Sequence, residues 1–356
     1  MIRPPEYVLG IQPYVPGKPI EELERELGIS NSVKLASNEN PVGPSPAALK
    51  AIAASFAGIN RYPDGAGFYL KKALSQEIGV SEEEIILGNG SNELLDLAAK
   101  TFMRDGDEAV MATPSFVVYF MAVQSVGGKS VQVPLKNYTH DLSAMAESVT
   151  PATRLIFIAN PNNPTGTINK KDEFDRMMER VPDDVLVVID EAYYEYVTDP
   201  DYAEGMKYLR SDKNVLVLRT FSKIYGLAGL RIGYGIARKE ILADMNRLRA
   251  PFNTGTISQK AALAALADKG HIGLSREVNE NGKQYLYREL GALGIPYVPT
   301  EANFLYIPVE GSAALYEKLL KMGVIIRPMG PNAVRVTIGL PEENERFIEA
   351  LKATKR

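Results

Sequence analysis

The chain contains no cysteine, and histidine occurs only at His140 and His271 among its 356 residues. The absence of cysteine excludes disulfides and thiolate chemistry, and it mildly favours a reducing compartment. With two histidines available, we do not expect a histidine-built metal site or a catalytic triad, and we expect no bound metal.

Long hydrophobic runs and a strong net charge are also missing. No apolar run approaches the length of a transmembrane helix, and Met1-Ile-Arg-Pro-Pro5 lacks the hydrophobic core of a signal peptide. The net charge of −4 gives no sign of nucleic acid or an anionic membrane as a partner. We therefore expect a cytoplasmic protein that binds neither.

Short apolar runs alternate with helical patterns through the middle of the chain. Six of these runs predict strands, at residues 85–87, 108–111, 130–133, 154–158, 185–189 and 215–218. Several are apolar on both faces, which is typical of parallel strands covered by helices on each side. The pattern predicts an α/β fold with a mostly parallel central sheet sandwiched by helices.

After Gly294 the pattern changes to short strands lying between two helices. We interpret this part as a smaller α+β domain, approached through a long helix predicted at about 275–293. The first residues form a Pro/Gly-rich arm with a short amphipathic helix and no core of their own. The expected division is a large domain at 40–275 and a small domain made of 1–39 and 276–356.

Polar residues follow the predicted strands. In a parallel sheet the ligand lies at the carboxyl ends of the strands, so these residues are candidates for a binding site. The segments are Thr113-Pro-Ser-Phe116, Asn160-Pro-Asn-Asn-Pro-Thr-Gly166, Asp190-Glu-Ala-Tyr193 and Thr220-Phe-Ser-Lys223. A glycine turn at residues 88–93 between a strand and a helix could aim backbone amides at an anion, although an ordinary tight turn fits it equally well.

Lys223 follows the apolar strand at 215–218, among hydroxyl groups and glycines. A lysine held there can lose its proton and become a nucleophile, most familiarly as a Schiff base with an aldehyde cofactor. Taken alone, the segment fits a surface lysine after a strand better, because short motifs are weak evidence.

Together the strand ends predict a pocket for a phosphorylated aromatic cation. Helix-end amides, hydroxyls and a guanidinium can hold the phosphate: Gly90, Ser91, Asn92, Thr220, Ser222 and Arg231. Phe116 can stack on a ring, and Asp190 can pair with a protonated ring nitrogen. Asn163 and Tyr193 can hydrogen-bond a ring oxygen. Each residue alone also has a structural interpretation, as a cap, a core aromatic or a surface ion pair.

These residues and their order resemble the fold type I pyridoxal-phosphate aminotransferases. The segment Ser222-Lys223…Gly229-Leu-Arg231, the Asn-Pro-x-Asn-Pro-Thr-Gly turn and the Asp-x-x-Tyr pair carry the resemblance. Within that superfamily the chain looks most like the histidinol-phosphate aminotransferases of histidine biosynthesis. Five segments carry this second likeness: 35–41, Arg61-Tyr-Pro63, 88–93, Glu301-Ala-Asn-Phe304 and 334–339.

The resemblance implies pyridoxal 5'-phosphate as cofactor and small-molecule amine and 2-oxo acid substrates. Lys223 would be the Schiff-base lysine and proton shuttle, and Asp190 would keep the pyridine nitrogen protonated. Asn163 and Tyr193 would bind the ring's 3-oxygen. Tyr62 would reach the cofactor phosphate of a second subunit, so the resemblance implies a homodimer with a shared active site.

The same resemblance assigns the substrate-binding end. Arg335 would bind a substrate carboxylate as a two-point fork. Asn38, Tyr14 and Arg327 stand where the family binds the amino-acid or phosphate end of the substrate. Phe116 departs from the tyrosine that many relatives carry, which preserves stacking and removes a hydroxyl.

Other functions stay open at this point. A pyridoxal-phosphate-binding regulator would need a DNA-binding extension that the chain lacks. A serine–lysine hydrolase would leave Asp190 and Asn163 unexplained. An aromatic-amino-acid aminotransferase or a threonine-phosphate decarboxylase would use the same fold, and motifs do not separate them from a histidinol-phosphate enzyme.

Overall fold

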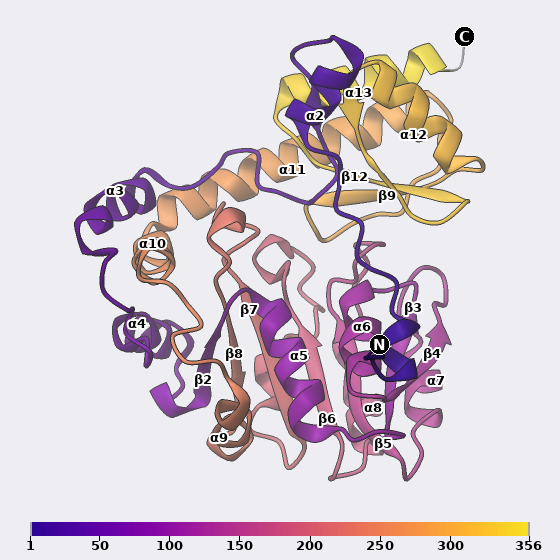
Figure 1. Cartoon of the computed structure of the whole chain (residues 1–356). Coiled ribbons are helices and arrows are strands. Elements are labelled where there is room, and N and C mark those ends of the chain that lie inside the picture. The colour runs from indigo at the N-terminus through magenta and orange to yellow at the C-terminus, as the bar shows by residue number, and fades with distance from the viewer. Residues whose placement is uncertain (1, 355–356) are drawn as a thin grey trace.

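The computed structural model of the chain describes residues 2–354, and its centre is a seven-stranded sheet (Figure 1). In spatial order its strands are β2 (Ile85–Gly88), β8 (Gly233–Ala237), β7 (Asn214–Thr220), β6 (Leu186–Asp190), β5 (Thr153–Ala159), β3 (Glu108–Thr113) and β4 (Lys129–Pro134). β8 pairs antiparallel with both β2 and β7, and the other neighbours pair in parallel. The predicted mostly parallel sheet is confirmed.

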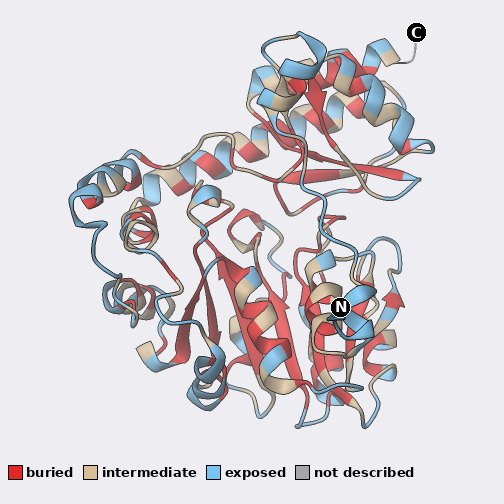
Figure 2. Ribbon diagram, viewed as in Figure 1, coloured by how far each residue is buried: buried red, intermediate tan, exposed pale blue. Residues whose placement is uncertain are grey.

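Helices cover both faces of this sheet and make it the middle of three layers. One face packs against α5 (Ser91–Phe102), α6 (Val117–Ser125) and α9 (Lys239–Leu248). The other packs against α3 (Pro46–Ser55), α4 (Phe68–Ile78), α7 (Leu142–Glu147), α8 (Lys171–Arg180) and α10 (Thr256–Ala267). Along β5, Leu155 and Phe157 enter the first layer while Ile156 and Ile158 enter the second, which is why the run is apolar throughout. Figure 2 shows that the strands of the central sheet are mostly buried.

A smaller part of the chain lies above the carboxyl ends of the parallel strands (Figure 1). It holds an antiparallel sheet of β11 (Arg327–Pro328), β12 (Ala333–Thr337) and β9 (Phe304–Pro308), and a parallel pair of β1 (Val33–Lys34) and β10 (Val324–Ile325). Its helices are α2 (Ile20–Leu27), α12 (Ser312–Lys321) and α13 (Pro341–Thr354). Leu23 of α2 packs with Ala36 and Ile325, so the N-terminal segment contributes to this part.

Two further helices and five short turns complete the described chain. These are α1 (Glu6–Leu9), α11 (Lys269–Ala292) and the 3-10 turns η1 (Phe56–Gly58), η2 (Glu82–Glu84), η3 (Tyr194–Tyr196), η4 (Gly205–Tyr208) and η5 (Ala228–Leu230). No helix within residues 2–354 has the length and apolar character to cross a membrane.

The long helix α11 begins earlier than the sequence pattern predicted. We expected a helix from about 275, whereas it starts at Lys269 because the Asp268 carboxylate accepts a hydrogen bond from the backbone amide of His271 at 3.2 Å. α11 therefore runs through the expected domain boundary at 275 and connects the two parts of the molecule as one continuous helix (Figure 1). The division at 40 and 275 itself stays a prediction.

Candidate active site

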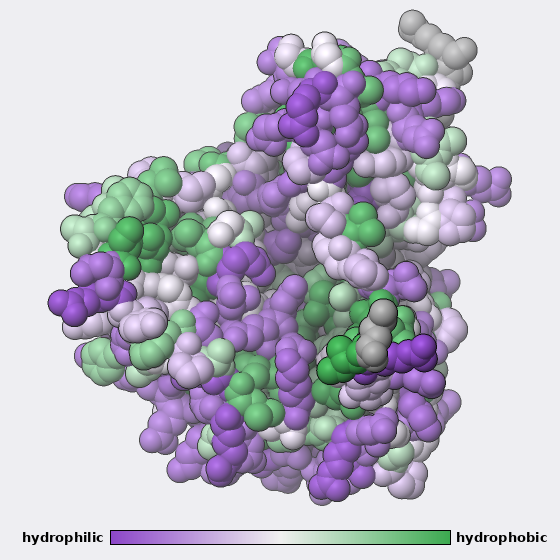
Figure 3. Space-filling view, in the orientation of Figure 1, coloured by the Kyte–Doolittle hydropathy of each residue, from purple (hydrophilic) through white to green (hydrophobic). Residues whose placement is uncertain are grey.

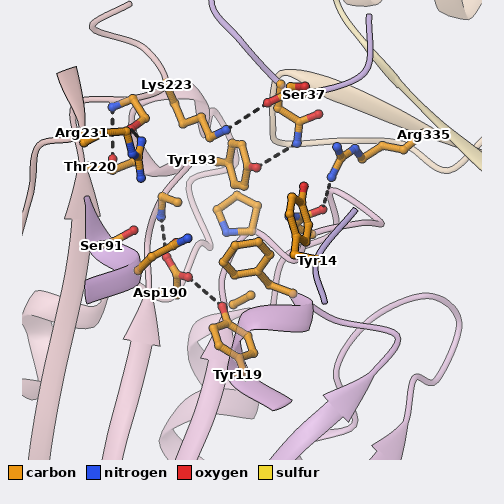
Figure 4. A pocket seen from close by; sticks show the side chains of 18 residues that line it. Tyr14, Ser37, Ser91, Tyr119, Asp190, Tyr193, Thr220, Lys223, Arg231 and Arg335 are labelled. Carbon is orange, nitrogen blue, oxygen red and sulfur yellow. Dashed lines mark hydrogen bonds between the residues drawn. The ribbon is translucent and has the colours of Figure 1, made fainter. Parts of the chain in front are cut away.

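A cavity of about 190 Å³ opens at the carboxyl ends of β5, β6 and β7, beneath the smaller part of the chain (Figure 4). Thirteen of the predicted site residues line it: Tyr14, Asn38, Ser91, Asn92, Phe116, Asn163, Asp190, Tyr193, Thr220, Ser222, Lys223, Arg231 and Arg335. Segments from both ends of the sequence thus meet at one place, as expected for the ligand site of a parallel sheet.

Lys223 is half-buried in this cavity, three residues after the end of β7. Its Nζ donates to the Ser37 carbonyl oxygen at 3.3 Å and lies 5.4 Å from the centre of the Tyr193 ring. Burial lowers the pKa of Lys223 to about 7, and the positive charge of Arg335 acts in the same direction. Near neutral pH the amine is therefore uncharged in a large fraction of molecules and available as a nucleophile.

Asp190 ends β6 and is buried, with 5% of its surface exposed. One carboxylate oxygen accepts from the Tyr119 hydroxyl at 2.8 Å, and the other accepts from the backbone amide of Ala192 at 3.1 Å (Figure 4). Burial raises the pKa of Asp190 to about 6. Within residues 2–354 this carboxylate makes no ion pair, although the charge of Lys223 acts on it from a longer distance, so the site offers a buried negative charge to a cationic ligand.

Two side-chain pairs link the smaller part of the chain to the strand ends. Arg335 of β12 donates to Asn163 Oδ1 at 2.6 Å and to the Ala36 carbonyl oxygen at 2.7 Å, and its Nε is buried without a partner. Asn38 Nδ2 donates to the Tyr193 hydroxyl oxygen at 2.8 Å. The guanidinium and the phenol are thereby held on the same side of the cavity (Figure 4).

An anion cradle lies at the other side of the cavity. Ser91 is the first residue of α5, whose free backbone amides and positive helix end face the site. Arg231 Nη1 donates to Ser222 Oγ at 3.2 Å, and Thr220 Oγ1 accepts from the Ser222 amide at 3.1 Å. Gly90 has a φ of 74°, and a Cβ there would clash with the Arg231 guanidinium. Only glycine permits this close approach.

The model of the family described as aminotransferase class I and II matches residues 30–351. The chain belongs to this family. It is 52% identical to a histidinol-phosphate aminotransferase of Moorella thermoacetica, over 98% of this chain and 92% of that protein. A histidinol-phosphate aminotransferase of Nitrosococcus oceani is 49% identical over 97% of this chain and 95% of the relative.

A solved structure supports the same assignment. The histidinol-phosphate aminotransferase of Sinorhizobium meliloti, in complex with pyridoxal-5'-phosphate, superposes with a TM-score of 0.91 at 27% identity and covers 99% of each chain. The predicted membership among the fold type I aminotransferases and the predicted resemblance to the histidinol-phosphate group are both confirmed.

Three predicted site residues of this aminotransferase lie away from the cavity lining. Gly90 sits behind it against Arg231. Tyr62 is 82% exposed and stacks on Phe252 with ring centres 4.8 Å apart. Arg327 donates to the Val15 carbonyl oxygen at 2.8 Å, and its guanidinium lies 5.5 Å from the centre of the Tyr14 ring. The roles predicted for these residues stay predictions.

Two residues that form hydrogen bonds with Lys223 or Asp190 were not predicted from the sequence. Ser37 supplies the carbonyl oxygen bound by Lys223; it lies in the segment 35–41 that the sequence singled out, beside Asn38, but its own role was not predicted. Tyr119 donates to Asp190, and it also packs edge-on against Phe116 with ring centres 5.6 Å apart. A signal existed for Tyr119, because it follows Phe116 by three residues at the start of α6, and that spacing puts both on one helix face.

Replacing Tyr119 with phenylalanine is expected to raise the pKa of Asp190 further. The phenol donates a hydrogen bond to the ionised carboxylate, so its removal disfavours the charged form. Carbon-13 NMR titration of the aspartate carboxyl in cofactor-free protein measures the shift. Tyr138→Phe, at an exposed position, is the matched control. An unchanged Asp190 titration would show that the hydrogen bond does not stabilise the charge.

Proposed function

We propose that this chain is a pyridoxal-phosphate-dependent aminotransferase that transfers the amino group of histidinol phosphate to 2-oxoglutarate, giving imidazole acetol phosphate and glutamate in histidine biosynthesis. One observation carries the proposal. The same cavity holds a lysine whose pKa is lowered to about 7 and a buried carboxylate without a cationic partner among the described residues. A pyridinium ring that carries an aldehyde would react with the lysine and pair its positive charge with the carboxylate.

The residues present fit the cofactor. Its phosphate suits the amides at the start of α5, the Ser222 and Thr220 hydroxyls and the Arg231 fork. The space left by the missing side chain of Gly90 allows the guanidinium to approach the backbone there. When bound, pyridoxal phosphate supplies an electron-withdrawing ring that delocalises the electron pair left when a bond to the substrate's α-carbon breaks.

The protein's own side chains perform the remaining work. Lys223 Nζ removes the proton from the substrate α-carbon and later returns one, which requires the uncharged amine that burial provides. Asp190 holds a proton on the ring nitrogen through its buried negative charge. Asn163 and the Tyr193 hydroxyl line the cavity and would orient the ring's oxygen substituent. Phe116 would stack on the ring face.

The substrate-binding end is proposed to lie at the smaller part of the chain. Arg335 is 9% exposed and lines the cavity, and its Nε has no hydrogen-bond partner in the described chain. A planar guanidinium donates two hydrogen bonds to two oxygens of a carboxylate or a phosphate, so one residue can serve both half-reactions. Tyr14 and Asn38 line the same end, and Arg327 stands behind Tyr14.

An amine panel with 2-oxoglutarate as acceptor tests this substrate assignment. Histidinol phosphate is expected to outperform dephosphorylated histidinol by roughly tenfold or more, because one charge-assisted contact contributes about 1.5–3 kcal/mol. Arg335→Lys is expected to weaken both half-reactions, since lysine cannot reproduce the two-point fork. The exposed Arg288→Lys on α11 serves as control. Equal rates with phenylalanine or tyrosine would favour an aromatic aminotransferase, and carbon dioxide release from threonine phosphate would favour a decarboxylase.

The functional unit is proposed to be a cytoplasmic homodimer with a shared active site. Large apolar side chains are exposed together on the segment around α3 and α4: Leu49, Phe56, Ile59, Tyr62, Phe68 and Tyr69. Figure 3 shows apolar residues gathered over α3. A second copy would cover this surface and bring its Tyr62 to the cofactor phosphate. Sedimentation of the wild type and of Tyr62→Ala measures the assembly.

A further inference from the structure

A second cavity, of about 410 Å³, lies on the sheet face opposite α5, between the ends of α4 and α10, the start of α11 and the turns η3 and η4. None of its lining residues belongs to the active-site cavity. The walls are unusual because buried aromatic and charged side chains meet there: Glu195, Arg219, Tyr225 and Tyr234. The volume is within the range of small-molecule sites.

Glu195 is a buried acid of this cavity, and one of its two carboxylate oxygens has no hydrogen-bond partner in the described chain. It is 5% exposed, its Oε2 is buried without a hydrogen bond, and within the described chain its carboxylate makes no ion pair. Burial raises the pKa of Glu195 to about 7. Burial makes the ionised form of this carboxylate unfavourable, and a cation bound beside it would stabilise that form.

The other charges of the cavity are mostly satisfied within the protein. Arg219 pairs with Glu191 at 2.8 Å and with Glu204 at 3.0 Å. At the rim, Lys269 pairs with Glu77 at 2.5 Å. None of these pairs involves Glu195, whose carboxylate feels the positive charges of Arg219 and Arg276 without forming an ion pair with either in the described chain.

Arg276 provides the complementary charge at the mouth of the cavity. Its Nε donates to the backbone carbonyl of Glu195 at 2.5 Å, and among the described residues its guanidinium makes no ion pair. The exposed Arg276 head and the buried Glu195 carboxylate therefore present one positive and one negative group within a single cavity. The rings of Tyr194 and Tyr225 supply apolar surface in the cavity, and the Arg219 guanidinium lies over the Tyr194 ring, 3.7 Å from its centre.

We propose that this second cavity is a binding site for a free α-amino acid, with its ammonium group on Glu195 and its carboxylate on Arg276. The side chain of the ligand would lie against the tyrosine rings. A zwitterion of this kind satisfies both unpaired groups, whereas a simple amine or a simple acid satisfies one. This assignment is independent of the substrate proposed for the first cavity.

The position of the cavity suits a regulatory role. Glu195 lies two residues after Tyr193, and Tyr225 lies two residues after Lys223. The two segments that wall the second cavity therefore also carry two residues of the first one. A ligand that shifts η3 and the loop at Tyr225 would also shift the Tyr193 hydroxyl and the Lys223 amine.

Titration calorimetry of the holoenzyme with each common L-amino acid tests the proposal. At least one is expected to bind with an affinity that falls about tenfold or more in both Glu195→Gln and Arg276→Gln, because each loses a charge-assisted contact. Binding should persist in Glu277→Gln, an exposed control on the same helix, and in Arg335→Lys, an active-site variant.

Two results would overturn the assignment. The first is that no amino acid binds. The second is that every amino acid that binds does so with an affinity that Arg335→Lys weakens and Glu195→Gln leaves intact, since all of them would then lie in the first cavity, where glutamate is expected as a product. Arg276 is exposed, so its variant tests the site even if Glu195→Gln folds poorly. Methyl esters and decarboxylated amines of the binding amino acid should bind Arg276→Gln and the wild type equally, because they lack the carboxylate.

Discussion

Lys223→Ala is expected to lower turnover by about 10⁴-fold or more while leaving the protein able to bind pyridoxal phosphate non-covalently. General acid–base catalysis by a positioned group alone contributes roughly 10²–10⁴-fold, and this amine is proposed to be the point of covalent attachment as well. The anion cradle and Asp190 do not depend on the lysine for their positions, since their hydrogen bonds run to other residues.

The measurement combines spectroscopy with peptide mapping. The wild type incubated with cofactor is expected to be yellow, and borohydride should bleach the colour and leave the cofactor fixed on Lys223. Lys318→Ala, on the outer face of α12, is a matched control that should keep wild-type colour and turnover. A wild type that stays colourless would end the pyridoxal-phosphate proposal, and a label on another lysine would end the assignment of Lys223.

The strands of the central sheet could be predicted because their physical signal is local. A strand covered on both faces must be apolar at consecutive positions, as in Val187, Val188 and Ile189 of β6, all fully buried. The residue that follows such a run then stands at the carboxyl end of the sheet by geometry alone. The positions of Asp190 and Lys223 near this edge of the sheet could be predicted for this reason, whereas their roles were inferred from the family resemblance.

The hydrogen-bond partners could not be predicted, because they come from distant segments. Arg335 bonds to Asn163 across 172 positions, and Asn38 bonds to Tyr193 across 155. Periodicity places a residue on a face of its own element and says nothing about which loop will lie opposite. The start of α11 was missed for a different reason, since the pattern of α10 runs close to the Asp268 cap and hides the boundary.

Asp190→Asn is expected to lower turnover by about a hundredfold or more, because the amide cannot favour a protonated ring nitrogen. Asp190→Glu keeps the charge and should be milder. The affinity for pyridoxal phosphate should fall with the rate, and Asp212→Asn, at an exposed position, is the control. Near-normal turnover of Asp190→Asn would show that the aspartate is structural.

The pH dependence of stability gives this prediction a second, independent readout. The pKa of Asp190 is raised to about 6 from its ordinary 3.8, so the folded apoprotein holds a proton that the unfolded chain has already lost between these values. The wild-type apoprotein should therefore lose stability as the pH rises from about 4 to about 6, by ~3 kcal/mol at most for a shift of this size. Asp190→Asn should lack this loss, and thermal unfolding across that window measures the difference.

Cofactor binding should restore stability to the wild type at neutral pH and do so much less in the variant, because only the carboxylate gains a cationic partner. If both apoproteins show the same pH profile, the buried charge of Asp190 is already compensated within the protein and cannot be what retains the ring nitrogen's proton.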